Sequence, residues 1–201
     1  LATPDADGIC ASQTTGAAGN LLINGALAAS GVATLGTKEG HRVEITSAGN
    51  LSALTFTLTG ADPDNPGRSI SEAITGPNAT TVTSTKYYKT VTIVHSNGAV
   101  ASAATVGTAD EVMYKTIPLD FKLPYFIYGF QVDISGTINY TVQHTMTNVL
   151  AGDAPVWFDH DTVVSKTVDA TSNYVIPVTA TTIKVNSYTA GATLAFTIVG
   201  R

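Results

Sequence analysis

Strict alternation of apolar and polar residues is the feature that most constrains the fold of this chain. In Leu51–Gly60 (LSALTFTLTG), the apolar residues Leu54, Phe56 and Leu58 alternate with threonines. Successive side chains of a β-strand point to opposite faces, so this pattern predicts a strand with one buried face. Similar alternation predicts further strands at His41–Ala48, Arg68–Gly76 and Ile138–Asn148.

Turn-forming residues separate these segments at intervals of about 8–12 residues, which is typical of sandwiches and barrels. Examples are the cluster ADPDNPG at Ala61–Gly67 and the triplet Ser96-Asn97-Gly98. Threonine is the most frequent residue, and its branched side chain favours a pleated, half-buried surface. The sequence therefore predicts an all-β fold of the β-sandwich or jelly-roll type, either as one sandwich or as two small β-sandwich halves.

The chain divides into three segments by composition. Residues 1–40 are rich in Gly, Ala, Ser and Thr, and Gly25, Gly31 and Gly36 disfavour a helix there, so we expect an extended N-terminal arm. Such an apolar arm either packs on its own domain or docks onto a neighbouring subunit. Residues 41–112 and 113–201 form two β-rich halves, which either fold separately or share one sandwich.

Charge and cysteine content exclude several classes of protein. Charged residues make up only 12% of the chain, the net charge is −5, and no basic run is present, which argues against nucleic-acid binding. No apolar stretch reaches the length of about 18 residues that a membrane helix needs, so no membrane association is expected. The single cysteine, Cys10, excludes an internal disulfide and a Cys-based metal site.

Motifs for catalysis are missing from the sequence. The chain has no G-x-S-x-G elbow and no phosphate-binding glycine loop, and its four histidines are scattered. The glutamates Glu44, Glu72 and Glu111 are isolated from one another, whereas glycoside hydrolysis needs two facing carboxyl groups. We therefore expect neither an enzyme nor a cofactor.

Two short acidic motifs resemble metal sites without meeting the requirements. Asp62-Pro63-Asp64 opens like a calcium loop, but Pro66 occupies the fifth position and Ala73 the twelfth, so we expect a turn. In Asp159-His160-Asp161, a strand would place the histidine on the face opposite to the two carboxylates. The sequence predicts no metal site at either place.

Two long segments carry a resemblance to a known class of proteins. In Asn50–Val94, the features that carry the resemblance are a TLTG strand, an acidic turn, the strand end EAITGPN and the segment VTSTKYYKTV. In the second half, these features are the strand INYTVQHT, the loop VWFDH and the closing strands around VIPVTATTIKVN and ATLAFTIVG. These segments resemble structural proteins of tailed-bacteriophage particles, in particular the capsid cement, or decoration, proteins.

The resemblance implies a non-enzymatic protein on the capsid surface of the virion. Its function would be to bind the outer shell and stabilise the capsid lattice by non-covalent contacts, with the major capsid protein of the same phage as its partner. The resemblance also implies a homotrimer, and threefold attachment would strengthen weak individual contacts. A tail or head–tail junction component and a carbohydrate-binding adhesion module are the alternatives that the sequence leaves open.

Apolar and aromatic side chains anchor most protein interfaces, which selects the candidate contact residues. The candidates are Leu21, Leu22, Ile23, Tyr87, Tyr88, Tyr125, Phe126, Tyr128 and Trp157. For each of them, packing in the core of the chain itself is the competing interpretation. For Tyr87 and Tyr88, which lie between Lys86 and Lys89, an edge strand guarded by lysines is favoured over a surface that stacks on nucleic-acid bases.

Overall fold

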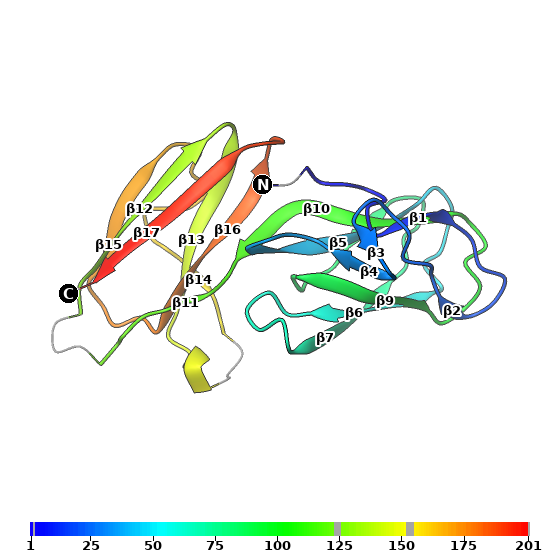
Figure 1. Cartoon of the computed structure of the whole chain (residues 1–201), viewed down its shortest axis with the longest axis horizontal. Coiled ribbons are helices and arrows are strands. Elements are labelled where there is room, and N and C mark those ends of the chain that lie inside the picture. The colour runs from blue at the N-terminus through cyan, green and yellow to red at the C-terminus, as the bar shows by residue number, and fades with distance from the viewer. Residues whose placement is uncertain (2, 123–125, 152–154, 201) are drawn as a thin grey trace. The chain divides into compact units, whose positions relative to one another are not determined.

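The computed structural model describes residues 1, 3–122, 126–151 and 155–200 (Figure 1). The chain divides into two compact units. The N-terminal unit is Pro4–Val112, and the C-terminal unit is Met113–Arg201 together with Leu1–Thr3. The described residues form antiparallel β-strands and a single 3-10 turn at Val149–Ala151, so the protein is all-β, as predicted.

The N-terminal unit contains two groups of hydrogen-bonded strands. The first has the order β3 (Ala28–Ala29), β4 (Val32–Thr34), β9 (Thr90–Ser96), β6 (Thr55–Ala61) and β7 (Ser69–Thr75), with β2 (Gly19–Asn20) also paired to β9. The second contains β8 (Thr81–Thr83), β5 (Glu39–Ser47) and β10 (Ala104–Tyr114), with β1 (Cys10–Gln13) also paired to β10.

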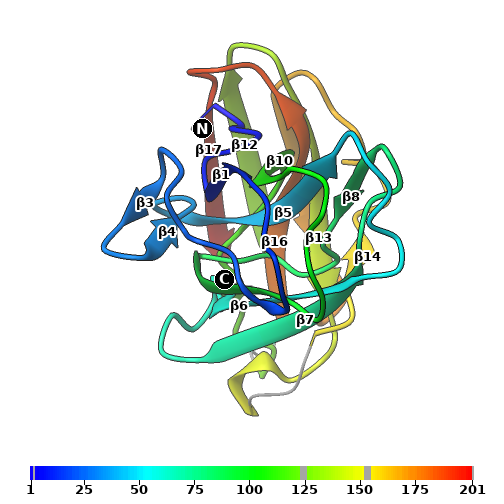
Figure 2. The same ribbon diagram turned by 90° about the vertical axis from the view of Figure 1, so that its right-hand side faces the viewer.

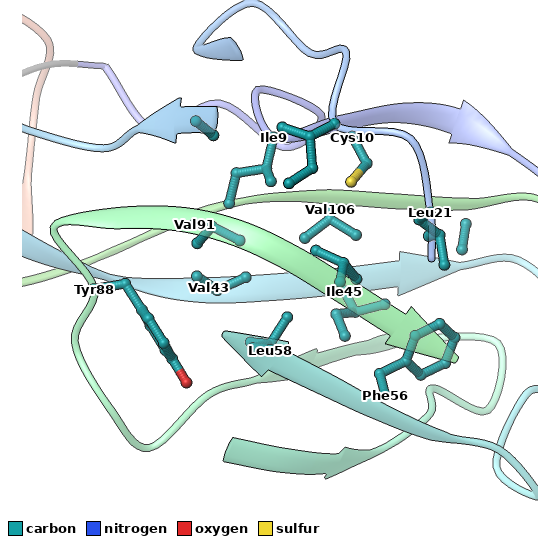
Figure 3. Packing of buried hydrophobic residues seen from close by; sticks show 14 of the residues in the cluster. Ile9, Cys10, Leu21, Val43, Ile45, Phe56, Leu58, Tyr88, Val91 and Val106 are labelled. Carbon is teal, nitrogen blue, oxygen red and sulfur yellow. The ribbon is translucent and has the colours of Figure 1, made fainter. Parts of the chain in front are cut away.

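Alternating side chains from both groups bury a single core (Figure 3). Phe56 and Leu58 on β6 are fully buried, while the threonines that alternate with them are half-buried, so the predicted alternation is confirmed on this strand. Val43 and Ile45 on β5 enter the same core from the other group. Each such side chain contributes roughly 1.5–3 kcal/mol by leaving water.

The N-terminal segment does not extend away from this unit. Ile9 and Leu35 are buried in the core, and the Ile9 amide donates a hydrogen bond to the Val106 carbonyl at 3.0 Å. The Leu21 amide likewise donates to the Val94 carbonyl at 2.8 Å. From Pro4 on, the expected extended arm is therefore folded onto the N-terminal unit, because its apolar side chains are buried in the core there and its backbone pairs with strands of that unit.

The C-terminal unit also contains two groups of strands (Figure 1, Figure 2). A three-stranded sheet has the order β15 (Ala170–Tyr174), β12 (Tyr128–Ser135) and β17 (Thr193–Gly200). The other group contains β14 (Phe158–Asp159), β13 (Ile138–Thr145) and β16 (Ala180–Tyr188), with β11 (Ile117–Pro118) also paired to β16.

Aromatic side chains of the three-stranded sheet pack against one another in the C-terminal unit. The Phe130 ring on β12 lies 5.3 Å from the Tyr174 ring and 5.7 Å from the Phe196 ring, measured between centroids. The Tyr174 hydroxyl lies 3.0 Å from the Thr181 hydroxyl on β16, which links the two groups. Phe130 and Tyr174 are thus buried core residues of this unit.

Candidate interaction surface

The apolar patch Leu21–Ile23 exposes only its central residue. Leu21 and Ile23 are buried, whereas Leu22 is 64% exposed. The Gln13 side chain fixes the backbone of Leu22, since its Nε2 donates to the Leu22 carbonyl and its Oε1 accepts from the Leu22 amide, each at 2.9 Å. Of these three interface candidates, Leu22 alone is available to a partner.

The adjacent tyrosines Tyr87 and Tyr88 lie in the segment between β8 and β9 and are not part of the expected edge strand. Tyr88 is fully buried, and its backbone exchanges hydrogen bonds of 2.8 and 3.0 Å with that of His41. The Tyr87 hydroxyl donates to the Glu111 carboxylate, which also accepts a hydrogen bond of 3.2 Å from Arg42. Burial and the Glu111 carboxylate raise the pKa of Tyr87, so this phenol stays neutral.

The aromatic candidates of the C-terminal unit are largely internal. Phe126 and Tyr128 are buried, with ring centroids 4.9 Å apart, and the Tyr128 hydroxyl accepts a hydrogen bond from the Asp120 amide at 3.0 Å. Trp157 is half-buried, and its neighbour Phe158 is exposed. Tyr125 lies outside the described residues. Packing within the chain therefore accounts for Phe126 and Tyr128.

Exposed apolar side chains are concentrated on the C-terminal unit. In the part of the chain that the structure describes, the N-terminal unit exposes only two large apolar side chains, those of Leu22 and Ile93. The C-terminal unit exposes Ile117, Ile127, Met146, Leu150, Val156, Phe158, Val164, Val168, Val175, Ile176 and Val199. Large exposed apolar patches are typical of interaction sites. The same unit also has a hollow of about 470 Å³ next to Leu119, Phe121 and Leu150.

Part of this apolar surface lies at one end of the three-stranded sheet. Gly129 on the central strand pairs with Val199 on β17, and the adjacent Tyr128 pairs with Tyr174 on β15. Ile127, immediately before β12, and Val175, immediately after β15, are both exposed there, as is Val199. A Cβ atom added to Gly129 would have no neighbour within 4 Å, so the surface is open above this glycine. A glycine inside a strand often marks the close approach of another chain or ligand.

The sequence carried a signal for this surface that the interface candidates missed. After Tyr174, which is buried, the chain continues with Val175, Ile176 and Pro177. Because successive side chains of a strand point to opposite faces, at least one of two adjacent apolar residues is expected to be exposed. In the structure, both Val175 and Ile176 are exposed. The interface candidates were chosen mainly for aromatic character, and this choice favoured side chains such as Phe126 and Tyr128 that are buried in the chain itself.

A cluster of rings surrounds the two histidines of the C-terminal unit. The His160 ring packs edge-on against Phe130 at 5.1 Å and against Tyr174 at 5.2 Å, and the His144 ring lies 5.5 Å from Tyr174. Burial lowers the pKa of His144, and the neighbouring His160 lowers it further, against the opposing effect of Asp161 and Asp159. The cluster therefore favours the neutral form of the His144 imidazole.

A buried histidine also lies in the N-terminal unit. His41 on β5 is almost fully buried, with its Nε2 4.0 Å from the Glu39 carboxylate. Burial lowers the pKa of His41, and this effect outweighs the attraction of Glu39. The residue is thus held as a neutral core side chain.

The acidic motif at Asp62 is a structural turn. The buried Asp62 carboxylate accepts a hydrogen bond of 2.7 Å from the Asp64 amide and one of 2.9 Å from Arg68 Nε. The two carboxylates of Asp159-His160-Asp161 are exposed, whereas the His160 ring is buried. Over the described ranges, no group of three or more His, Cys, Asp or Glu side chains is placed to hold a metal ion.

The same described residues contain no helix of the length and apolarity that crossing a membrane requires. Comparison of the chain with protein-family models and with curated protein sequences found no match.

Proposed function

We propose that this chain is a non-enzymatic structural protein of a tailed-phage particle and that it binds the outer capsid shell as a decoration protein. The observation that supports this proposal most is the concentration of exposed apolar side chains on one of its two units. A protein that covers another protein surface needs one face rich in apolar contacts, and such contacts supply most of the binding free energy. The sequence resemblance to cement proteins agrees with this assignment.

We further propose that each unit is a β-sandwich. In the N-terminal unit, side chains of β5 and β6 from two strand groups meet in one core. In the C-terminal unit, Tyr174 of one group contacts the Thr181 hydroxyl and the His144 ring of the other. Two sheets that bury their facing sides define a sandwich.

On the capsid, the C-terminal unit would contact the shell and the N-terminal unit would remain outside it. The major capsid protein would be the partner. Each copy would add a modest binding free energy, and repetition over the shell would make the sum large. Self-association would strengthen attachment further because linked contacts bind as one.

The test compares two matched variants of the full chain in binding to shells that lack the protein. Ile176→Ser changes an exposed residue of the C-terminal unit, and Ile93→Ser makes the same change in the N-terminal unit. Loss of a buried apolar contact of this size costs about 1.5–3 kcal/mol, which corresponds to a weakening of about tenfold or more. Co-sedimentation with shells should show this loss for Ile176→Ser and wild-type binding for Ile93→Ser.

Wild-type protein should also raise the temperature at which the shells melt. Absence of binding to shells would contradict the proposal. Equal effects of the two variants would contradict the role of the C-terminal unit.

A carbohydrate-binding module is the second candidate, favoured by one observation. The exposed Phe158 follows the half-buried Trp157, and such neighbouring aromatic side chains are suited to packing against sugar rings. Binding of the purified chain to glycans, abolished by Trp157→Ala, would favour this module over the capsid assignment.

A further inference from the structure

Strand β17 lies at the edge of the three-stranded sheet of the C-terminal unit. It pairs with β12 along its whole length, from Thr193 opposite Ser135 to Gly200 opposite Tyr128, with no shift in register. β12 is its one strand partner in the described structure. A strand at an edge presents a row of N–H and C=O groups that another strand can pair with.

The sequence of β17 lacks the features that protect edge strands. Its eight residues, TLAFTIVG, contain no charge and no proline, and the regular register excludes a bulge. Phe196, Ile198 and Val199 favour the extended conformation. Natural proteins usually block such edges with lysine, proline, bulges or a covering loop.

The other long edge strand, β7, is protected in this way. The Lys86 ammonium donates a hydrogen bond of 2.7 Å to the Ser71 carbonyl of β7. The Glu72 carboxylate of β7 accepts hydrogen bonds from the amides of Thr85 at 2.8 Å and Lys86 at 3.0 Å. A charged segment thus lies along β7, and no comparable contact to β17 is seen in the described part of the chain.

The opposite edge of the same sheet, β15, is both shorter and covered. It has five residues, and the His160 ring nitrogen Nε2 lies 3.3 Å from the Asn173 carbonyl of this strand. A side chain of the same unit therefore occupies part of the β15 edge. Within one sheet, one edge is blocked and the other is left open.

We propose that β17 pairs with β17 of a second copy of this chain, in antiparallel orientation about a two-fold axis. A row of alternating backbone donors and acceptors is satisfied best by another extended backbone, and β17 itself is the long unprotected strand that the described residues offer. The pairing would join two three-stranded sheets into one of six strands. The edges that remain would be the two covered β15 strands, so the assembly closes at two copies.

The side-chain pattern of β17 is compatible with pairing to itself. Leu194, Phe196 and Ile198 are half-buried and lie on the inward face, whereas Ala195, Thr197 and Val199 are exposed. Directly opposite residues of an antiparallel pair share a face. A register centred on Thr197 places Thr197 opposite its copy and Ala195 opposite Val199, and it keeps both inward faces on the same side.

A matched pair of lysine substitutions tests the pairing. Thr197 on β17 and Thr171 on β15 are both exposed and both pair with Gln131 on the central strand, one on each side. Thr197→Lys would bring two like charges together at the two-fold axis, which should raise the dissociation constant of the pair several-fold. Thr171→Lys makes the same change at the covered edge and should leave the pair intact.

The measurement is the mass in solution of the full chain and both variants, by light scattering over a range of concentrations. We expect twice the chain mass of 20.7 kDa for wild type and Thr171→Lys, and the single-chain mass for Thr197→Lys. Fluorescence of Trp157 checks that each variant is folded. If Thr197→Lys does not fold, Thr197→Glu also places two like charges opposite each other at the two-fold axis and provides the same test.

Four results would overturn the pairing. They are a wild-type monomer at all concentrations, a mass of three chains or one that grows without limit, both variants remaining paired, and both variants separating. A mass of three chains would instead favour the homotrimer that the resemblance implies. Because no shell is present, the result is independent of whether the protein binds a capsid.

Discussion

At the scale of single residues, the buried histidines make stability depend on pH. Burial lowers the pKa of both His41 and His144 in the folded chain. Above the ordinary histidine pKa of about 6.5, both residues are neutral whether the chain is folded or not. As the pH falls below that value, the unfolded chain binds protons first, so the free energy of unfolding decreases until the lowered pKa is reached.

We predict that the urea midpoint of unfolding decreases between pH 7.5 and pH 5.5 and that His144→Gln makes this decrease smaller. Each histidine contributes at most about 1.4 kcal/mol per pH unit. Comparison of variant with wild type at the same two pH values isolates the histidine from the carboxylates. If the midpoint falls by the same amount in His144→Gln as in wild type, His144 does not titrate in this range.

The identity of buried residues was only partly predictable from the sequence. Alternation placed Phe56 and Leu58 inside, because the direction of a side chain in a strand is a local property. It gave no information on Tyr88, which lies between two strands and is fully buried. Its burial depends on the distant His41 backbone, and such a contact has no local signature.

At the scale of elements, the turn after β6 depends on one carboxylate. Asp62 accepts hydrogen bonds from a backbone amide and from Arg68, and its side chain is buried. We predict that Asp62→Ala lowers the free energy of unfolding by about 1–3 kcal/mol, because the Asp64 amide and the charged Arg68 side chain lose their acceptor. Urea unfolding measures this change.

Two controls accompany the Asp62 variant. Asp161→Ala, at an exposed position of the C-terminal unit, should change the free energy of unfolding by less than about 0.5 kcal/mol. Added calcium should not raise the midpoint of the wild-type protein, because Arg68 and backbone amides already occupy the Asp62 carboxylate. A clear rise with calcium would contradict the interpretation of this segment as a turn.

Strand positions were more predictable than strand partners. The sequence predicted strands at His41–Ala48 and Arg68–Gly76, and the structure has β5 at Glu39–Ser47 and β7 at Ser69–Thr75. The pairing of Cys10 on β1 with Val106 on β10 joins residues far apart in the chain. The sequence carries no short-range signal for that pairing, and for this reason it predicts an arm over residues 1–40.

At the scale of the whole molecule, the two units have separate sets of buried residues. Phe56 lies in the core of the N-terminal unit, and Ile183 is fully buried in the C-terminal unit. The chain has one tryptophan, Trp157, and it belongs to the C-terminal unit. Tryptophan fluorescence therefore reports on the unfolding of that unit.

We predict that core substitutions act on one unit at a time. Ile183→Ala should lower the urea midpoint measured by Trp157 fluorescence, at a cost of about 2–5 kcal/mol. Phe56→Ala, at about 3–5 kcal/mol, should shift the transition measured by far-ultraviolet circular dichroism and leave the fluorescence midpoint unchanged. A common shift of both signals in both variants would mean that the units unfold together.

The burial of Cys10 makes its thiol a chemical probe for the opening of the N-terminal unit. The thiol is fully enclosed in the core of the N-terminal unit, and burial raises its pKa to about 12. An alkylating reagent reacts with the thiolate, so Cys10 is modified only when this unit opens. The rate at which the chain gains one alkyl group therefore measures how often its N-terminal unit opens, and no cysteine has to be introduced for this measurement.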